Sequence, residues 1–142
     1  DFMKSYMKAQ TGLESLIIFS FIGILLAFAF LNYAAQTSDT RFASTFLEAR
    51  KVCYTLKNAI DGANANGFGF EQKINLPTTL ETLDYEIRVD GEVKRIDVIW
   101  EDKLASCSIG TKDVKNSTGY NSFSISKGEN NIKNLQGVVV VG

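Results

Sequence analysis

Apolar residues are concentrated near the start of the chain, where they form one nearly unbroken run. Residues 16–31 are all apolar except Ser20 and Gly23, and residues 15–38 carry no charge. A helix over residues 16–33 rises about 1.5 Å per residue, so it is about 27 Å long, close to the thickness of a bilayer's hydrocarbon core. The run therefore predicts a helix that is inserted in a membrane at some stage.

A second, amphipathic pattern follows without a break. No Pro or Gly occurs between Gly23 and Gly62, and charged residues lie largely off one apolar stripe. This spacing is typical of a helix with one buried face. We predict one long helix that starts near Phe2 or Gln10 and reaches about Ile60, with Asp61-Gly62 and the Asn/Gly-rich run after it as its end. The stripe consists of Leu31, Ala35, Phe42, Phe46, Ala49, Cys53, Leu56 and Ile60.

The rest of the chain shows the period of β-strands. Apolar and charged residues alternate over 83–90, which predicts a half-buried strand. Asp90-Gly91 predicts a two-residue type I′ turn, and Val93 is out of phase with the return strand, which suggests a bulge. Residues 110–121 are predicted to form a polar surface loop. The return strand carries Ile96, Val98 and Trp100 on one face, and further strands are predicted at 73–76, 105–109, 122–126 and 135–141.

These patterns predict an α+β fold. A long N-terminal helix, apolar in its first half and amphipathic in its second, packs on an antiparallel β-sheet domain. The run Val138–Val141 has no polar face, so we place it in a strand that is covered on both faces. The chain has 142 residues, and roughly 100 of them remain for the soluble domain, which is enough for a modest core.

The charges before the apolar run indicate its orientation. Lys4 and Lys8 precede the run, so the positive-inside rule places the N-terminus in the cytoplasm and residues 39–142 outside. A cleavable secretory signal is the alternative, with a weak cleavage site within residues 32–36, and it would release a soluble domain. The net charge of −1 gives no indication of a nucleic-acid partner.

A polar block before the apolar run carries a more specific motif. Ala9 precedes Gln10, a small residue, Gly12, stands two positions later, and Glu14 follows just before the apolar residues. This block resembles the class III signal peptide of archaeal type IV pilin-like proteins. In that family a basic leader is removed before a glutamine, and a small residue and a glutamate follow at the third and fifth mature positions. The resemblance implies cleavage between Ala9 and Gln10 by a prepilin peptidase.

The match to this family covers about residues 8–38 and has two mild departures. Gly12 stands where the family more often has Ser, and Ile18 stands where Leu is usual. A mature chain that begins at or before Asp1 stays open as an alternative to one that begins at Gln10.

The resemblance implies a function and a set of partners. The chain would be a pilin, the structural subunit of an extracellular helical homopolymer for adhesion. Its precursor would reside in the cytoplasmic membrane, and a cytoplasmic assembly ATPase and a membrane platform protein would drive assembly. Two alternatives remain: an anchored domain or minor pilin that does not polymerise, and a subunit of an archaellum-type motility filament. The family plan divides the chain into a leader or N-terminal extension, a filament-core helix, an amphipathic helix and an extracellular β-rich domain, at 1–9, 10–35, 36–62 and 63–142.

Two features of the apolar run bear on contacts between subunits. A carboxylate at its edge is costly to bury unless paired, and the resemblance implies that Glu14 pairs with the α-amino group of Gln10 on a neighbour. The alternative is an acid at the level of the lipid headgroups. Small residues recur along one ridge and would let helices approach closely, although they are common in any membrane helix. The expected contact residues are Gly12, Glu14, Leu16, Ser20, Gly23, Ala27, Leu31 and Ala34.

Three residues outside the run are candidates for covalent modification. Cys53 and Cys107 could form a disulfide, which an extracellular location permits and which would stabilise the fold by ~4 kcal/mol in the chain-entropy model. The alternative is two separate buried thiols. Asn116-Ser117-Thr118 is the only N-glycosylation sequon, and its alternative is a plain turn.

The sequence offers little for an enzyme. The chain has no His, which is the commonest general base, and it has no Gly-x-Ser-x-Gly, phosphate-loop or dinucleotide-binding motif. Its two Cys lack the close spacing of a metal site. We therefore expect no catalytic residues, no metal and no cofactor.

Overall fold

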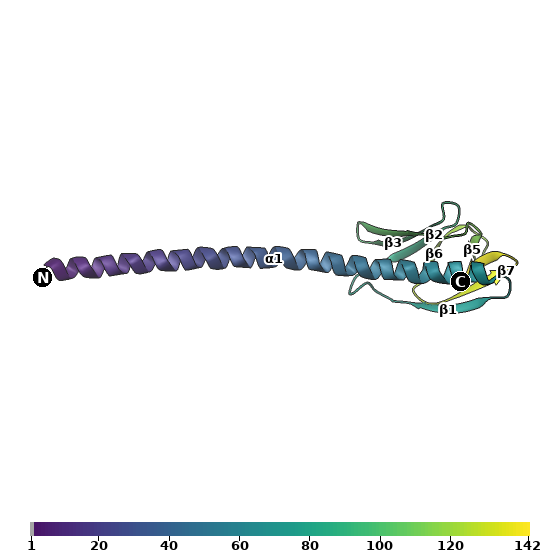
Figure 1. The fold of residues 1–142 in the computed structure, drawn as a ribbon, viewed down its shortest axis with the longest axis horizontal. Helices are drawn as coiled ribbons and strands as arrows, with labels where there is room; N and C mark the ends of the chain where they lie inside the picture. The colour runs from purple at the N-terminus through teal and green to yellow at the C-terminus, as the bar shows by residue number, and fades with distance from the viewer. Residues whose placement is uncertain (1) are drawn as a thin grey trace. The chain divides into compact units, whose positions relative to one another are not determined.

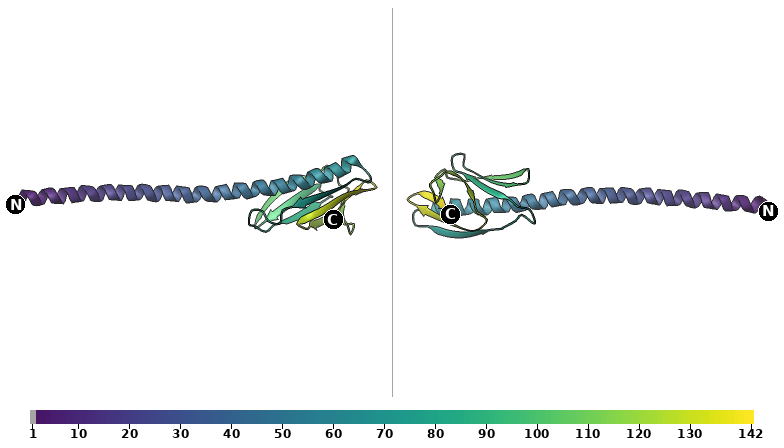
Figure 2. Two further views of the ribbon diagram at one scale, coloured as in Figure 1. Left: turned by 90° about the horizontal axis from the view of Figure 1, so that it is seen from below. Right: turned by 180° about the vertical axis from the view of Figure 1, so that it is seen from behind.

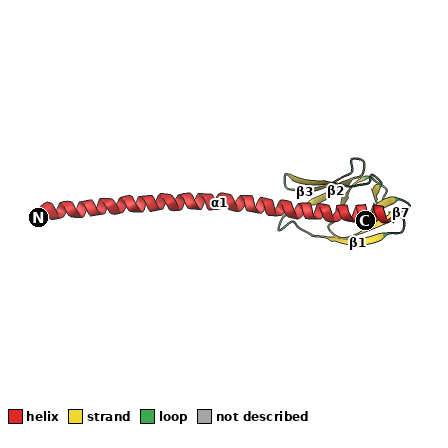
Figure 3. Cartoon of the chain, viewed as in Figure 1, coloured by secondary structure: helices red, strands yellow, loops and turns green. Residues whose placement is uncertain are grey.

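The computed structural model in Figure 1 describes the backbone of residues 2–142 and the side chains of residues 12–37 and 40–142. Within the described chain, one helix is followed by eight strands. The chain divides into two compact units, residues 1–42 and residues 43–142. The strands and the C-terminal part of the helix make up the second unit. Figure 3 colours the helix red and the strands yellow. The fold is thus α+β, as predicted from the sequence.

The helix α1 spans Phe2–Asn66 and continues through Gly62. It ends at Gly67, which has a φ of 78° and whose N–H donates to the carbonyl of Ala63 at 3.3 Å. Glycine suits this left-handed position because it has no Cβ to clash with the backbone. The predicted end in the Asn/Gly-rich run is confirmed, but Asp61-Gly62 does not end the helix and that part of the prediction is wrong. Asp61 instead ties the helix to the sheet domain, because its carboxylate accepts the N–H of Gly110 at 2.7 Å.

The strands form two sheets of four. The first sheet has the order β1 (Glu71–Leu76), β7 (Gly128–Leu135), β8 (Val138–Val141) and β5 (Val114–Asn116). The second has the order β4 (Lys103–Ser108), β3 (Arg95–Trp100), β2 (Glu86–Asp90) and β6 (Ser122–Ile125). All neighbours pair antiparallel except β5 and β8, which are parallel. The last turns of α1 lie alongside both sheets in the views of Figure 2.

One hydrophobic core joins the helix to the sheets. From the strands it includes Trp100, the only tryptophan, which is 1% exposed. Burying an aliphatic core side chain such as Leu56, which is 0% exposed, stabilises the fold by about 1.5–3 kcal/mol. The predicted stripe is buried only in its second part, because Leu31 is 67% exposed and Phe42 is 48% exposed. The buried residues of the helix are Thr45, Ala49, Val52, Cys53, Leu56, Ala59, Ile60 and Ala63.

The hairpin of β2 and β3 confirms the predicted alternation but not the predicted turn. Ile96, Val98 and Trp100 are buried on one face, as are Ile87 and Val89 on the strand opposite. The loop between the strands has four residues, 91–94, since Asp90 pairs with Arg95.

An Asx-type turn shapes this loop. The Asp90 carboxylate accepts the N–H groups of Glu92 at 3.0 Å and Val93 at 3.4 Å, and Lys94 has the positive φ of 55°. A type I′ turn at Asp90-Gly91 needs positive φ at both residues, and neither has one. The predicted two-residue turn and the bulge at Val93 are therefore wrong.

The strand β7 was not predicted, because its inward positions are not all apolar. Asn130 and Asn134 are buried beside Ile132. The Nδ2 of Asn130 donates to the carbonyl of Ser126 at 2.8 Å. The Nδ2 of Asn134 donates to the carbonyl of Ala63 at 2.9 Å, which links the strand to the helix end. Two buried amides thus replace the apolar residues by which a strand is recognised.

The C-terminal strands differ from the prediction in two further ways. The predicted strand at 135–141 is divided, because Leu135 ends β7 and a turn with positive φ at Gln136 and Gly137 precedes β8. Val138 and Val140 are half-buried while their neighbours are buried, so β8 is not covered on both faces. The predicted loop at 110–121 contains the short strand β5.

Candidate functional site: the exposed apolar helix

The described side chains of residues 12–36 are all exposed, although most of them are apolar. Their large hydrophobic side chains range from 46% exposed at Ile22 to 73% exposed at Phe30. Soluble monomers rarely expose an apolar patch larger than a few hundred Å². By its length and composition this part of α1 could cross a membrane. The exposed residues are Leu13, Leu16, Ile17, Ile18, Phe19, Phe21, Ile22, Ile24, Leu25, Leu26, Phe28, Phe30, Leu31 and Tyr33.

Seven of the eight expected contact residues share one face of this helix. At about 100° per residue, they fall within an arc of about 100°. We call this the small-residue face, and it consists of Gly12, Leu16, Ser20, Gly23, Ala27, Leu31 and Ala34. The eighth residue, Glu14, lies about 150° from the centre of this arc, on the opposite side of the helix. A single neighbouring helix therefore cannot contact the small-residue face and Glu14 at once.

The two glycine positions of this face have room for a larger residue in the described chain. A Cβ added at Gly12 or at Gly23 would meet no atom within 4 Å. Glycine within a helix costs about 0.5–1 kcal/mol relative to alanine. Both glycines therefore weaken the helix without relieving any crowding inside the described chain. Because glycine has no side chain, these two positions would allow a neighbouring helix to approach closely.

A shallow apolar hollow of about 360 Å³ lies on the same helix, with Ser20 among its lining residues. The small side chain of Ser20 leaves this depression between larger neighbours. Such a hollow is the shape that receives a side chain from a second helix. The other lining residues are Leu13, Leu16, Ile17, Phe21 and Ile24.

Polar side chains at the end of the apolar run bond to the helix backbone. The Nδ2 of Asn32 donates to the carbonyl of Phe28 at 2.8 Å, and the hydroxyl of Thr37 donates to the carbonyl of Tyr33 at 2.9 Å. Transfer of a polar side chain from water to an apolar environment costs less free energy when the side chain is already hydrogen-bonded. Glu14 differs, because it is exposed and has no ion pair among the described side chains.

The expected processing site is only partly visible. Ala9 and Gln10 belong to the backbone of α1, but their side chains lie outside the described residues. The expected pairing of Glu14 with the amine of Gln10 therefore stays a prediction.

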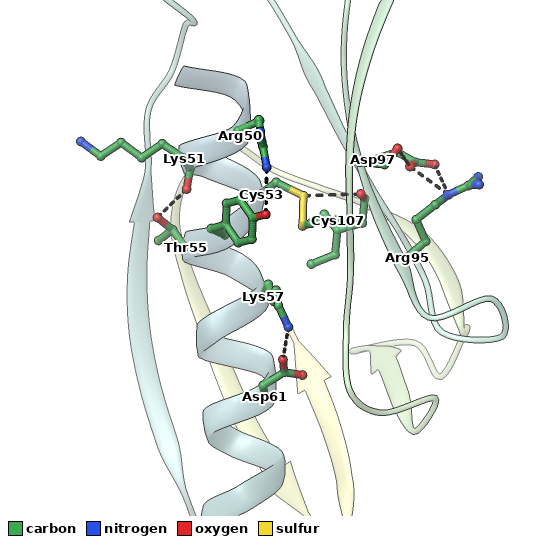
Figure 4. Close-up of a disulfide and its surroundings, with 12 residues drawn as sticks. Arg50, Lys51, Cys53, Thr55, Lys57, Asp61, Arg95, Asp97 and Cys107 are labelled. Carbon is green, nitrogen blue, oxygen red and sulfur yellow. Dashed lines mark hydrogen bonds and ion pairs between the residues drawn. A yellow bond between two sulfur atoms is a disulfide. The ribbon is translucent and has the colours of Figure 1, made fainter. Parts of the chain in front are cut away.

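Cys53 and Cys107 are joined by a disulfide, with an S–S distance of 1.97 Å and a Cα–Cα distance of 6.1 Å (Figure 4). The bond links the buried face of α1 to the edge strand β4. Two turns further along the helix, Asp61 forms an ion pair with Lys57 at 2.7 Å besides its bond to Gly110. The last part of α1 is thus fixed at two points, to β4 by the disulfide and to Gly110, which follows β4, by the hydrogen bond of Asp61.

A surface groove of about 500 Å³ lies between α1 and β1, and sequence reasoning missed it. Its walls come from segments 20 or more residues apart, so no local motif marks it. Glu48 accepts the N–H of Glu81 at 2.7 Å, and Thr45 donates to the carboxylate of Glu81 at 3.3 Å. These acids hold a loop to the helix. The lining residues are Glu48, Lys51, Val52, Thr55, Asn75, Leu76, Pro77, Thr79 and Glu81.

The ionisable groups with shifted pKa serve structural contacts. The hydrogen bond and charge of Lys127 lower the pKa of Asp84. Hydrogen bonds from Asn131 and Lys133 lower the pKa of Glu71.

Two further shifts belong to groups on or next to the second sheet. Hydrogen bonds from Arg88 and Ser124 lower the pKa of Glu86. Burial raises the pKa of Tyr85 to about 12, and its hydroxyl donates to the carbonyl of Pro77. The described residues contain no cluster of three or more His, Cys, Asp or Glu that could hold a metal.

Comparisons with known proteins give no relative from which a function could be taken: no family model, no curated protein and no solved structure matches the chain.

Proposed function

We propose that this protein is the structural subunit of an extracellular, archaeal type IV pilus-like filament that serves adhesion. The observation that carries the proposal is the helix of residues 12–36, which is apolar and exposed on every side. It continues directly into a helix segment whose one face is buried in a disulfide-linked domain. The motif around Gln10 and Glu14 adds the resemblance to this family.

The apolar helix has two possible environments, and both exclude water. In the precursor it would lie in the cytoplasmic membrane, and in the filament it would pack against the same helix of other subunits. The hydrophobic gain of moving it from lipid to such a bundle is small. Packing of the small-residue face, together with work from an assembly ATPase, would favour the polymer. A head-to-tail contact that does not close generates an open helical filament, so one repeated interface is enough.

The positions of Glu14 and the small-residue face are consistent with several neighbours for each helix. The small-residue face would pack closely on one neighbour. Glu14, on the opposite side, would pair with the α-amino group of Gln10 on another. Because Coulomb attraction is stronger where water is excluded, this pair would fix the axial register of the subunits.

A volume change on the small-residue face tests the proposal. Gly23→Leu adds a side chain where two helices would meet, whereas Ile22→Leu conserves volume next to it. Material sheared from cells is sedimented, and the pellet and the membrane fraction are probed for the protein. We expect Gly23→Leu to remain in the membrane and give no sedimentable filament, while Ile22→Leu assembles normally. Normal assembly of Gly23→Leu would contradict packing through this face.

A membrane-anchored domain that never polymerises is the second candidate function. A lipid bilayer would cover residues 12–36 as well as a helix bundle would, which favours this alternative. Glu14→Gln removes the charge but keeps the shape of the side chain. An anchored monomer would show the same amount of protein in the membrane for both forms and no pellet for either. A filament subunit would give a pellet for the natural protein and would lose it in Glu14→Gln.

A further inference from the structure

Asn116 ends the strand β5 and begins a tight turn whose backbone bonds fix its position. Its N–H donates to the carbonyl of Tyr120 at 3.0 Å, and its carbonyl accepts the N–H of Gly119 at 3.0 Å. Gly119 has a φ of 91°, which a residue with a Cβ rarely adopts. On the other side, Asn116 pairs with Val141 of β8. The residue is therefore held at a defined point of the surface.

The side-chain oxygen of Asn116 is fully engaged within this turn. Oδ1 accepts the N–H of Thr118 at 3.1 Å, the hydroxyl of Thr118 at 2.8 Å and the N–H of Tyr120 at 2.8 Å. Only an oxygen can accept two backbone N–H groups, so the donors settle which end of the amide faces the turn. The amide nitrogen Nδ2 lies at the other end, and it donates to no group in the described part of the chain.

The surroundings of Asn116 leave room for a large substituent. Asn116 itself is half-buried, while residues 117–120 are all exposed. Tyr120, whose N–H bonds to the side-chain oxygen of Asn116, is 68% exposed. Lys115 and Asn121 flank the turn, and both are only half-buried. The residues around the amide are thus exposed or half-buried, and none of residues 115–121 is a buried side chain that a bulky polar group on Nδ2 would have to displace.

We propose that Asn116 carries an N-linked glycan. The triplet Asn116-Ser117-Thr118 has the Asn-x-Ser/Thr spacing that glycosylation requires, with no Pro between. In the reaction, Nδ2 attacks the anomeric carbon of a lipid-linked oligosaccharide and forms a C–N bond. The bond from that carbon to the lipid phosphate oxygen breaks, the lipid phosphate leaves, and the amide proton passes to a base of the transferase. The inference rests on the proposed function in one respect, the placement of residues 43–142 outside the cytoplasm.

A substitution at Asn116 separates a glycan site from a purely structural turn. Asn116→Asp keeps an oxygen that can accept the three hydrogen bonds but removes the amide nitrogen. Thr118→Ser keeps both the hydroxyl and the sequon, and Thr118→Val removes both while conserving the shape. A structural role alone would be retained in Asn116→Asp, whereas a glycan would be lost.

The test is mass spectrometry of the full chain and of its tryptic peptides, with protein taken from its native cells. Trypsin can cut after Lys112, Lys115 and Lys127, so residue 116 falls in a peptide of residues 116–127, or 113–127 where a glycan blocks the cut. We expect this peptide to be heavier by one or more sugar residues in the natural protein and in Thr118→Ser. We expect the unmodified mass in Asn116→Asp and Thr118→Val.

Protease treatment of intact cells distinguishes the two ways in which the result could be negative. An unmodified peptide from protein that external protease digests overturns the glycan and leaves the proposed function standing. An unmodified peptide from protein that is protected inside the cell overturns both the glycan and the extracellular placement. Added mass that persists in Asn116→Asp places the modification on another residue and also overturns the inference.

Discussion

Removal of the disulfide should destabilise the second unit strongly. Cys53 and Cys107 are 54 residues apart in sequence. For a closed loop of that length the chain-entropy model gives about 14 cal/mol/K, or about 4 kcal/mol at 25 °C. In a unit of roughly 100 residues, that loss lowers the melting temperature by about 15–30 °C. We expect Cys107→Ala to lose about this amount.

The variants form a cycle that isolates the bond from the packing of the sulfur atoms. Cys53 is 1% exposed, so Cys53→Ala also loses buried contacts and should be the more destabilised single variant. The double variant should be no less stable than Cys53→Ala, because either single change already breaks the bond. Ser106→Ala on the same strand is the matched control. It loses one exposed hydrogen bond to Asp97 and should cost less than about 1 kcal/mol.

The assay is denaturant unfolding of the full chain in detergent, followed by the fluorescence of Trp100. This residue is the only tryptophan and is buried in the core of the second unit, so its emission reports that unit alone. A reducing agent should destabilise the natural protein and leave the double variant unchanged. A loss below about 1 kcal/mol in Cys107→Ala would refute the reasoning, because the bond would then not restrict the unfolded chain.

Three further predictions concern the second unit. Asn134→Ala leaves the carbonyl of Ala63 without its partner, and we expect calorimetry to show a loss of about 1–3 kcal/mol; an unchanged melting temperature would contradict this. Gly67→Ala places a Cβ at a φ of 78° and should cost about 1 kcal/mol in the same measurement, whereas equal stability would mean that the cap relaxes without strain. The lowered pKa values of Glu71, Asp84 and Glu86 contribute stability that is present above their unfolded values of about 4 and is lost as the pH falls through the folded values. Unfolding free energies should thus be level from about pH 8 to 5 and decline below about pH 4, and a rise on acidification would contradict the sign.

The sequence predicted the parts of the fold that follow a simple period. The second half of the long helix and the strands around Ile87 and Val98 bury apolar residues at regular intervals, and these elements lie where the pattern placed them. The helix ends in the predicted Asn/Gly-rich run, but it passes through Gly62, because Gly62 is tolerated inside a helix while Asp61 bonds to the sheet domain. A glycine alone does not end a helix when tertiary contacts hold it.

Other elements could not be predicted because hydrogen bonds of polar side chains to the backbone decide them, and hydrophobic periodicity does not report such bonds. The strand β7 buries Asn130 and Asn134. Each amide donates to a backbone carbonyl, and the sequence alone does not identify these partners. The Asp90 carboxylate selected a four-residue loop over the two-residue turn. The small-residue face of the candidate site was visible in the spacing, but only a helical geometry places Glu14 on the opposite side.

The most direct test of the proposed function is N-terminal sequencing and intact mass measurement of protein sheared from the cell surface. We predict that the protein sediments as a filament and that its mature chain begins at Gln10, which places Glu14 at the fifth position. A chain that begins at or before Asp1 and is extracted only with detergent would contradict the filament and indicate an anchored monomer.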